Sequence, residues 1–341
     1  MKPDLNKFAE VSIENLEHFL TEENHPEYVS YLNDLVEKGS FEAVEKLFNS
    51  YFWGDSYTEE DQPRALKLLG NFAEKNQSAQ AANVLAEHYR LYVDEEDSDQ
   101  NAVHWLQFSA SLRDGDSAFE LGKAYYLGTL GLAEDEDLAA KYLEQSLEYG
   151  DRKGYPVLAK IYLKSDDEEK CSRGKELMTV GAKSGNAECQ FELANRYLTG
   201  EGFKKDARLG ISWLFKASEQ DYVDALIRLG GMYLSGEEMD KSPYDGFRCF
   251  EKAAHKHSKL AQARLSSLYL LGVGVEKNLT LAYAWIRIAE RNLARRAPEN
   301  LSFTGELLGA HVLSEPQLKH SENFVTEFTK DKEWRYPVHD K

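Results

Sequence analysis

Cysteine, proline and long apolar runs are all scarce in this sequence of 341 residues. Its three cysteines, Cys171, Cys189 and Cys249, are odd in number and far apart, so they indicate neither a disulfide framework nor a CxxC metal motif. No run approaches the roughly 18 apolar residues that a membrane-spanning helix needs. Only 8 prolines interrupt long stretches rich in Ala, Leu, Glu and Lys, which favours helix over strand.

The first residues carry no apolar signal core, because an acidic amphipathic stretch follows the polar start at residues 1–6. Since the three cysteines also show no disulfide pattern, we expect a reducing, cytoplasmic location. A secreted chain whose signal peptide had already been removed would likewise show no apolar signal core.

Acidic side chains are in excess, and the excess lies in one half of the chain. Residues 1–150 carry 31 acidic against 11 basic side chains, a balance of −20, whereas residues 151–341 carry 28 against 30. A phosphate backbone requires a positive surface, so the N-terminal half is not expected to bind nucleic acid. It would instead attract a basic protein surface and speed that encounter. The alternative is that the acids only keep a long surface solvated.

A tyrosine recurs seven times, with spacings between 35 and 38 residues. The seven are Tyr51, Tyr89, Tyr125, Tyr162, Tyr197, Tyr233 and Tyr269. Four residues before each stands a leucine: Leu47, Leu85, Leu121, Leu158, Leu193, Leu229 and Leu265. Eight residues before each stands a small residue: Ala43, Ala81, Ser117, Gly154, Cys189, Ala225 and Ala261. Three residues after five of them stands a glycine: Gly54, Gly128, Gly200, Gly236 and Gly272.

These offsets describe one face of an α-helix, here called helix A, that ends at a glycine. About sixteen residues after most of the tyrosines, a bulky residue followed by small ones predicts a second helix, helix B. Clear examples are Trp105 with Ala110, Trp213 with Ala217, and Trp285 with Ala289. Because these aromatic residues recur at one helical register, we interpret them as core, and Tyr125 and Tyr197 in particular as core residues rather than catalytic acids.

A helix pair of this size cannot bury its own apolar face, so successive pairs must stack into a continuous core. The predicted fold is therefore all-α, an α/α solenoid (superhelix) of two-helix repeats. We expect seven repeats over residues 41–292 and helical caps over 1–40 and 293–341. The caps are predicted to hold helix pairs at 4–20 with 26–38, and at 299–313 with 315–330.

The recurring tyrosines, with the leucines, small residues and glycines at fixed offsets from them, are here called the ladder. The ladder resembles the Sel-one-like repeat, a branch of the tetratricopeptide-like helical repeats. The stretch Cys189–Gly200, followed by Trp213–Ser218, fits that pattern closely, and the segment Leu313–Leu318 is similar to the closing helix of many bacterial members. Two repeats depart from the pattern. The fourth has Ser165 in place of its glycine and Pro156 near the start of helix A. The first has Phe48 three residues before its tyrosine, where the other six repeats have a small residue: Ala86, Gly122, Ala159, Ala194, Gly230 and Ser266.

Sequence motifs of catalytic, nucleotide-binding or metal-binding sites are weak throughout the chain. There is no Gly-x-Ser-x-Gly elbow, Walker loop or dinucleotide fingerprint. Histidines two apart on a helix, as in His255-Lys256-His257, point about 200° apart and cannot share a metal ion unless the helix breaks. The acidic runs at 94–97 and 135–137 are expected in loops and lack the order of a calcium loop. We interpret Cys171 as an incidental thiol in a loop, and we expect no cofactor.

The remaining candidate for a functional site is a surface that binds a protein or peptide partner. In the related tetratricopeptide repeats helix A lines a concave groove, which here would expose the positions nine, six and two before each tyrosine and the one after it. The predicted partner-binding residues are Glu42, Glu45, Asn49, Phe52, Trp53, Glu87, Arg90, Asp116, Lys123, Tyr126, Lys160 and Asn195, with Gln80, Asn83, Phe119, Glu188 and Asp224 at equivalent positions. Such a mixture of charge, amide and aromatic groups suits a protein or peptide partner. Phe52 and Trp53 are the best anchor candidates, although burial of Phe52 against the N-terminal cap is an equal alternative.

The resemblance and the missing chemistry together predict a non-enzymatic scaffold or adaptor whose partner is basic. One alternative is a bacterial immunity protein that neutralises a toxin or effector enzyme. Another is a hydrolase with an unrecognised site in the groove, near Lys123, Lys160 or Cys171.

Overall fold

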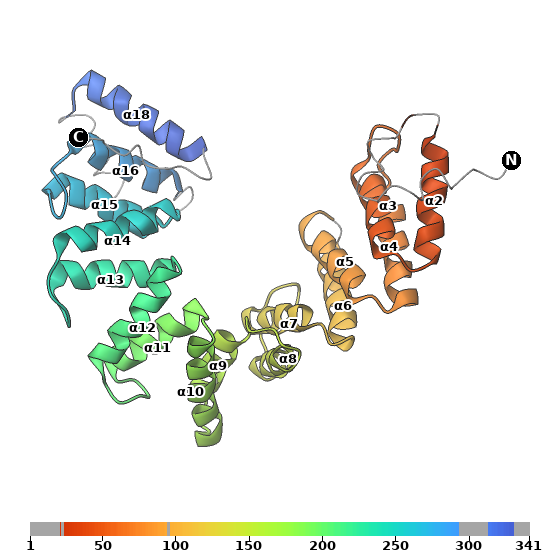
Figure 1. Cartoon of the computed structure of the whole chain (residues 1–341), viewed down its shortest axis with the longest axis horizontal. Coiled ribbons are helices and arrows are strands. Elements are labelled where there is room, and N and C mark those ends of the chain that lie inside the picture. Colours follow the sequence, from red (N-terminus) through yellow and green to blue (C-terminus); the bar gives the residue numbers. More distant parts are fainter. Residues whose placement is uncertain (1–20, 22–23, 94–95, 293–312, 331–341) are drawn as a thin grey trace. The chain divides into compact units, whose positions relative to one another are not determined.

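A computed structural model of the chain describes residues 21, 24–93, 96–292 and 313–330 (Figure 1). These residues form helices and loops and contain no strand, which confirms the predicted all-α fold of helix pairs. The expected helix at 4–20 lies outside the described residues, as does all but the last residue of the one at 299–313. None of the described helices is long and apolar enough to cross a membrane.

The helices alternate between helix A and helix B from the first predicted repeat onward. Before them lies α2 (His25–Glu37). The helices A are α3 (Phe41–Trp53), α5 (Ala79–Leu91), α7 (Gly115–Leu127), α9 (Tyr155–Leu163), α11 (Ala187–Thr199), α13 (Val223–Ser235) and α15 (Lys259–Leu271). The helices B are α4 (Gln62–Asn76), α6 (Ser98–Ser111), α8 (Glu136–Glu148), α10 (Glu168–Lys183), α12 (Ala207–Glu219), α14 (Pro243–His255) and α16 (Leu279–Asn292), and α18 (Glu315–Lys330) packs on α16.

Two compact units divide the chain, Met1–Leu177 and Met178–Lys341, with the boundary inside α10. Each unit has a core of its own. In the first unit, apolar side chains of α2 to α5 form one cluster and those of α5 to α7 another. In the second unit, the described core joins α13, α14, α15, α16 and α18.

Most of the helices A and B begin at a residue whose side chain accepts a backbone N–H of the first turn. Ser40, Ser78, Asp114, Asn186 and Ser258 cap helices A, and Asp61, Asp135, Asp206, Ser242 and Asn278 cap helices B, each accepting a backbone N–H three residues ahead. Such caps contribute on the order of 1 kcal/mol each. The helix-B caps have a second role, because the backbone N–H of each donates to the carbonyl of its ladder tyrosine, as Asp135 does to Tyr125 at 2.9 Å. This bond fixes where helix B starts relative to helix A.

The ladder glycines close helix A as the sequence predicts. Gly128, Gly200, Gly236 and Gly272 take left-handed φ values between 61° and 84°, a conformation that costs glycine little. In the fourth repeat, where Ser165 replaces the glycine, α9 is only 9 residues long, and its C-cap residue Lys164 is not left-handed. Its Pro156 lies in the first turn, where a missing N–H is tolerated.

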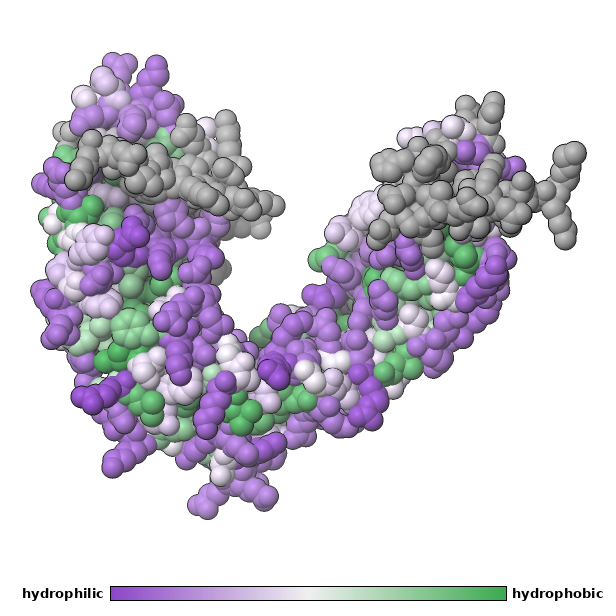
Figure 2. Space-filling view, in the orientation of Figure 1, coloured by the Kyte–Doolittle hydropathy of each residue, from purple (hydrophilic) through white to green (hydrophobic). Residues whose placement is uncertain are grey.

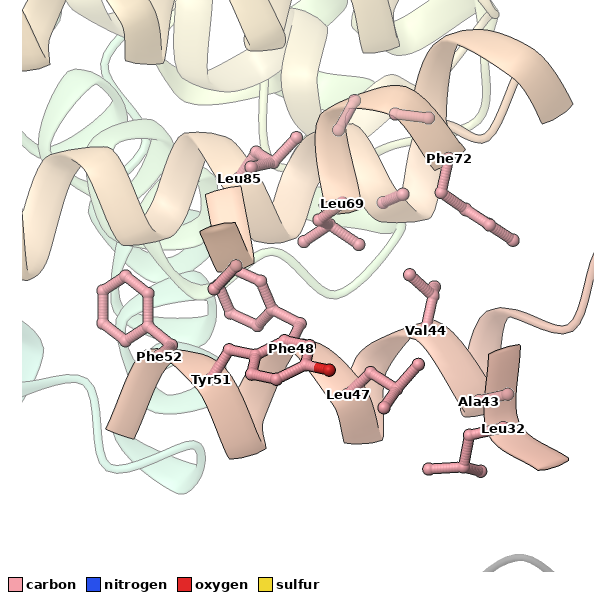
Figure 3. Packing of buried hydrophobic residues seen from close by; sticks show 14 of the residues in the cluster. Leu32, Ala43, Val44, Leu47, Phe48, Tyr51, Phe52, Leu69, Phe72 and Leu85 are labelled. Atoms are coloured by element: carbon pink, nitrogen blue, oxygen red, sulfur yellow. The ribbon is translucent and has the colours of Figure 1, made fainter. Parts of the chain in front are cut away.

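The ladder leucines and small residues form the core. All seven leucines are at most 1% exposed, and every residue eight or three before a tyrosine is buried. Phe48, the large residue at a small position, is fully buried as well, stacked on Phe52 with ring centres 5.2 Å apart. Figure 3 shows Val44, Phe48 and Phe52 extending from α3 toward the helices that carry Leu69 and Leu85.

The tyrosines themselves are less buried than predicted. Tyr51 and Tyr269 are 5% exposed, but the other five are only half-buried, as is Trp105. The hydroxyls of Tyr51 and Tyr162 each have a polar partner on a helix B: Tyr51 accepts a hydrogen bond from Arg64 at 2.9 Å, and Tyr162 donates to Glu144 at 2.6 Å. Burial and Glu144 together hold the pKa of Tyr162 well above its usual value, so it is a poor proton donor.

Candidate protein-interaction surface

Four of the predicted partner-binding residues line one hollow of about 720 Å³ in the first unit: Glu42, Glu45, Asn49 and Trp53. All four project from α3. The opposite wall comes from Tyr28, Val29 and Leu32 of α2, and the loop after α3 adds Asp55 and Tyr57. The hollow is therefore amphipathic, with an apolar wall, an exposed tryptophan and three carboxylates against the single cation Lys46.

The loop that borders this hollow is held by side-chain hydrogen bonds. Ser50 donates to Asp55 at 2.5 Å and lies 3.0 Å from the Thr58 hydroxyl, which in turn meets the ring of His25 at 3.2 Å. Burial would raise the pKa of Asp55, but the hydrogen bonds from Ser50, from the backbone of Tyr57 and from Thr58 outweigh it and hold the pKa below its usual value. Asp55 is therefore a carboxylate at neutral pH and adds to the negative charge of the hollow.

Phe52 is not part of this surface, and its prediction as an exposed anchor is wrong. Its ring is fully buried. It packs edge-on against His88 and Tyr92 of the next repeat, with ring centres 4.9 Å and 6.4 Å away. Its neighbour Trp53 is 52% exposed and lies over the outer edge of the same cluster, 4.9 Å from Tyr92.

A second, smaller hollow of about 230 Å³ lies between α5 and α7. It is lined by the predicted residues Glu87, Arg90 and Asp116, together with Asn83, Leu91 and Glu120. Here the acids again outnumber the cations, since Arg90 is the only basic residue among the lining side chains.

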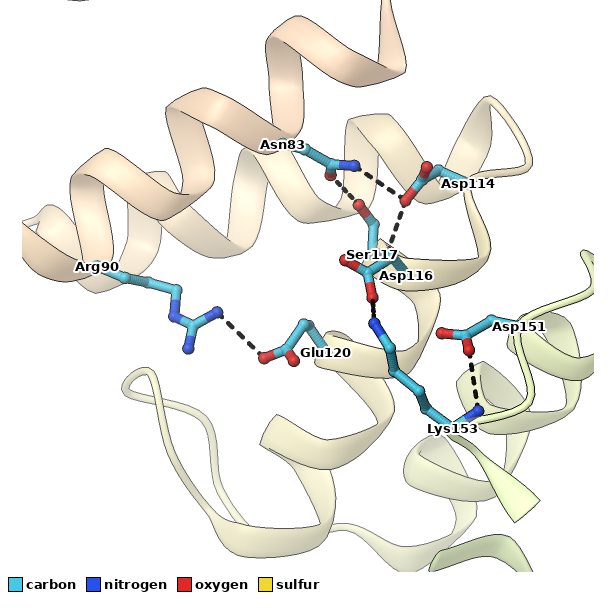
Figure 4. Close-up of polar contacts among 8 residues, drawn as sticks. All are labelled: Asn83, Arg90, Asp114, Asp116, Ser117, Glu120, Asp151 and Lys153. Atoms are coloured by element: carbon cyan, nitrogen blue, oxygen red, sulfur yellow. Dashed lines mark hydrogen bonds and ion pairs between the residues drawn. The ribbon is translucent and has the colours of Figure 1, made fainter. Parts of the chain in front are cut away.

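Polar contacts between successive repeats occupy several of these side chains (Figure 4). Arg90 pairs with Glu120 at 3.1 Å, Asp116 pairs with Lys153, and Asn83 donates to Asp114 at 3.1 Å while accepting from Ser117. A partner that engaged Arg90 or Asp116 would have to compete with these contacts. Glu42 and Glu87, by contrast, are exposed at the two hollows.

The other predicted residues lie outside both hollows. Lys123 is exposed, with its ammonium 6.0 Å from the Phe119 ring, and Tyr126 accepts a hydrogen bond from Lys164 at 3.4 Å. Lys160 is half-buried in α9. Asn195 belongs to the second unit.

Comparison with known proteins agrees with this repeat geometry. The Sel1 repeat model matches residues 42–76, 79–114, 115–151, 187–222, 223–258 and 259–292, which is more than half of the chain. The chain belongs to the Sel1 repeat family. The segment between the third and fourth matches, residues 152–186, holds α9 and α10, the helix pair that departs from the pattern.

Solved structures place this Sel1 repeat chain among helical repeat folds. A Sel1 repeat protein from Oxalobacter formigenes is 19% identical, covering 85% of this chain and 82% of its own, with a TM-score of 0.73. Yeast Tom70 is 15% identical, covering 89% of this chain and 62% of its own, with a TM-score of 0.50. An immunity protein from Pseudomonas aeruginosa, 14% identical over 76% of this chain and 86% of its own, has a TM-score of 0.45, too low to support an argument about function. No curated protein sequence matches the chain.

The sequence-based choice of positions included only Trp53 from one position that every helix A exposes. The residue two after each of the seven tyrosines is exposed: Trp53, Leu91, Leu127, Lys164, Thr199, Ser235 and Leu271. The position one after the tyrosine is instead buried at Phe52 and Leu198 and exposed only at Arg90. Helix geometry gives the reason, because one step of 100° keeps a side chain beside the core and two steps turn it away.

Cys171 and the acidic run 135–137 are placed differently from the prediction. Cys171 is in the first turn of α10 rather than in a loop, with its N–H donating to the Asp167 carbonyl at 2.8 Å. Asp135 caps α8, and Glu136 and Asp137 lie in its first turn rather than in a loop. Helix α14 ends at His255, and no three His, Cys, Asp or Glu side chains among the described residues are grouped to hold a metal ion.

Proposed function

We propose that this Sel1 repeat chain is a non-enzymatic scaffold that binds a basic protein or peptide along the helix-A side of residues 24–177. The helix-A side is the set of exposed faces of α3, α5, α7 and α9, which the family resemblance assigns to a concave groove. The observation that carries the proposal is the lining of the two hollows, where six carboxylates face two cations. Complementary charge of this kind raises association rates and selects partners.

The proposed compartment is the cytoplasm. All three cysteines are free, and Cys189 is buried in a ladder position where a thiol serves as a small core residue. Free thiols are the state that a reducing compartment maintains.

Charge removal from the helix-A side tests the proposal. A triple variant with Glu42, Glu45 and Glu87 each changed to Gln keeps the size of each side chain and removes three negative charges. We expect its affinity for a partner captured from the source cells to fall on the order of tenfold at low salt, and the loss to shrink at high salt as the charges are screened. Titration calorimetry at both salt concentrations measures this.

A matched control removes the same charge elsewhere. Glu219, Glu237 and Glu276 are exposed residues of the second unit, and changing all three to Gln alters the net charge equally. Equal weakening by both triple variants, or none by either, would contradict the proposed site and leave only a general effect of net charge.

A further inference from the structure

Large apolar side chains occupy the exposed position two after the tyrosine in the first three repeats. Trp53 is 52% exposed, Leu91 58% and Leu127 49%. Each stands at the last residue of its helix A, so the three recur at the same end of α3, α5 and α7. Tyr92, which follows Leu91 directly, is a further 49% exposed. We call these four residues the apolar rim.

The rim is a feature of this part of the chain rather than of every repeat. In the fourth to sixth repeats the same position holds Lys164, Thr199 and Ser235. In the second unit this position holds a large apolar residue only in the seventh repeat, where Leu271 is 70% exposed. The surface in Figure 2 is mostly hydrophilic, with hydrophobic residues showing between hydrophilic ones. Three successive apolar residues at one exposed register are therefore a local concentration of the kind that marks binding sites.

Contacts between the helices hold Trp53 and Tyr92 of the rim in place. The Trp53 ring lies edge-on to Tyr92 at 4.9 Å and to the buried Phe52 at 4.8 Å, so α3 and α5 meet at this end. The ion pair between Arg90 and Glu120 joins α5 to α7 beside Leu91. A partner would therefore meet a preformed surface at the apolar rim, which lowers the entropy cost of binding.

Both hollows adjoin the rim and give it an acidic border. Trp53 shares the larger hollow with Glu42, Glu45 and Asp55, and Leu91 shares the smaller one with Glu87 and Glu120. The apolar rim, with carboxylates beside it, complements a peptide segment that has apolar side chains along one edge and Lys or Arg along the other. The same acids repel phosphate-rich ligands such as nucleic acids and anionic membranes. A second copy of this chain, with its net charge of −18, is likewise disfavoured.

We infer that the apolar rim is the docking ledge for an amphipathic, basic peptide segment of the partner, whose apolar side chains pack on Trp53, Leu91 and Leu127. This inference rests on the proposed scaffold function and adds to it the anchoring residues and the chemistry of the segment they recognise. Truncating a buried aromatic or aliphatic anchor of a protein interface commonly costs a tenfold loss of affinity or more.

Peptide selection on the full chain tests the inference without a known partner. A library of random peptides displayed on phage is selected against the wild-type chain and against a variant carrying Trp53→Ser, Leu91→Ser and Leu127→Ser. We expect the wild-type chain to enrich peptides that combine Lys or Arg with Leu, Phe, Trp or Ile. A synthetic copy of a selected peptide should bind the triple variant at least about tenfold more weakly.

Leu271→Ser is the matched control, because it makes the same change at the same repeat position of the second unit and should leave peptide affinity unchanged. Circular dichroism checks that the triple variant is folded, and the double variant Leu91→Ser/Leu127→Ser replaces it if it is not. The inference is overturned if no peptide is selected, if the selected peptides are acidic or lack apolar residues, or if the rim variants bind as the wild type does. If the captured partner still binds the rim variants fully but not the Glu42/Glu45/Glu87 variant, the rim inference fails while the scaffold proposal stands.

Discussion

Replacement of Phe52 by alanine is expected to lower the free energy of unfolding by about 3–5 kcal/mol, the range for removing a buried phenylalanine ring. The ring is fully buried and contacts Phe48, His88 and Tyr92, so its loss leaves a cavity where α3 meets α5. Chemical denaturation followed by circular dichroism measures the change. Any weakening of partner binding by this variant would be a consequence of lost structure.

Trp53→Ala is the matched comparison, one residue further along the same helix. Half of the Trp53 side chain is exposed and its contacts are edge-on ring pairs, which contribute about 0.5–1.5 kcal/mol each. We therefore expect a stability loss of roughly 1–2 kcal/mol, well below that of Phe52→Ala. Equal losses for the two variants, or a larger one for Trp53→Ala, would contradict the assignment of Phe52 to the core and Trp53 to the surface.

Gly230→Val is expected to destabilise the chain by about 1–3 kcal/mol, the usual cost of overpacking a close helix contact. A Cβ atom at Gly230 would lie 2.8 Å from the Phe250 ring and 3.2 Å from the Gly246 carbonyl oxygen, so α13 and α14 would have to separate. The same close approach recurs at Gly122, whose added Cβ would meet Leu143 at 2.7 Å. Thermal or chemical unfolding of the variant measures the effect.

The neighbouring glycine provides the control. Gly231 lies in the same helix, and an added Cβ there would meet nothing within 4 Å. Because glycine weakens a helix interior by about 0.5–1 kcal/mol relative to alanine, Gly231→Ala should stabilise the chain by that amount. If both glycine variants were neutral, close helix approach would not explain the small residues of the ladder.

Most of the fold could be predicted because its determinants are local and repeated. The ladder leucines and small residues mark the buried face of helix A, the glycines mark its end, and both signals recur at a fixed period. The fourth helix pair was harder to predict, because Ser165 and Pro156 remove the signals that mark the ends of its first helix. The half-burial of tyrosines such as Tyr125 could not be read from spacing, because it depends on how far the adjacent helix B covers the ring.

The candidate surface was predictable only in part. Positions nine and two before the tyrosine lie about 180° and 160° from it around the helix, and both were correctly placed at the surface for Glu42 and Glu87. The residue one after lies only 100° away, which explains the burial of Phe52, whereas the residue two after lies at 200° and carries the apolar rim. Contacts between repeats, such as that of Arg90 with Glu120, join residues 30 apart in the chain and depend on the packing of α5 against α7. No local pattern encodes them.

Hydroxyl-radical footprinting of the complex with a captured partner tests the central claim most directly, since it reports which side chains the partner covers. In the free chain Trp53, Tyr92, Leu91 and Leu127 are exposed and should be oxidised readily, as should Leu271. Binding on the helix-A side of the first unit predicts that the partner slows oxidation of the four rim residues and leaves Leu271 unchanged. Unchanged oxidation of the rim, with protection confined to residues 178–341, would contradict it.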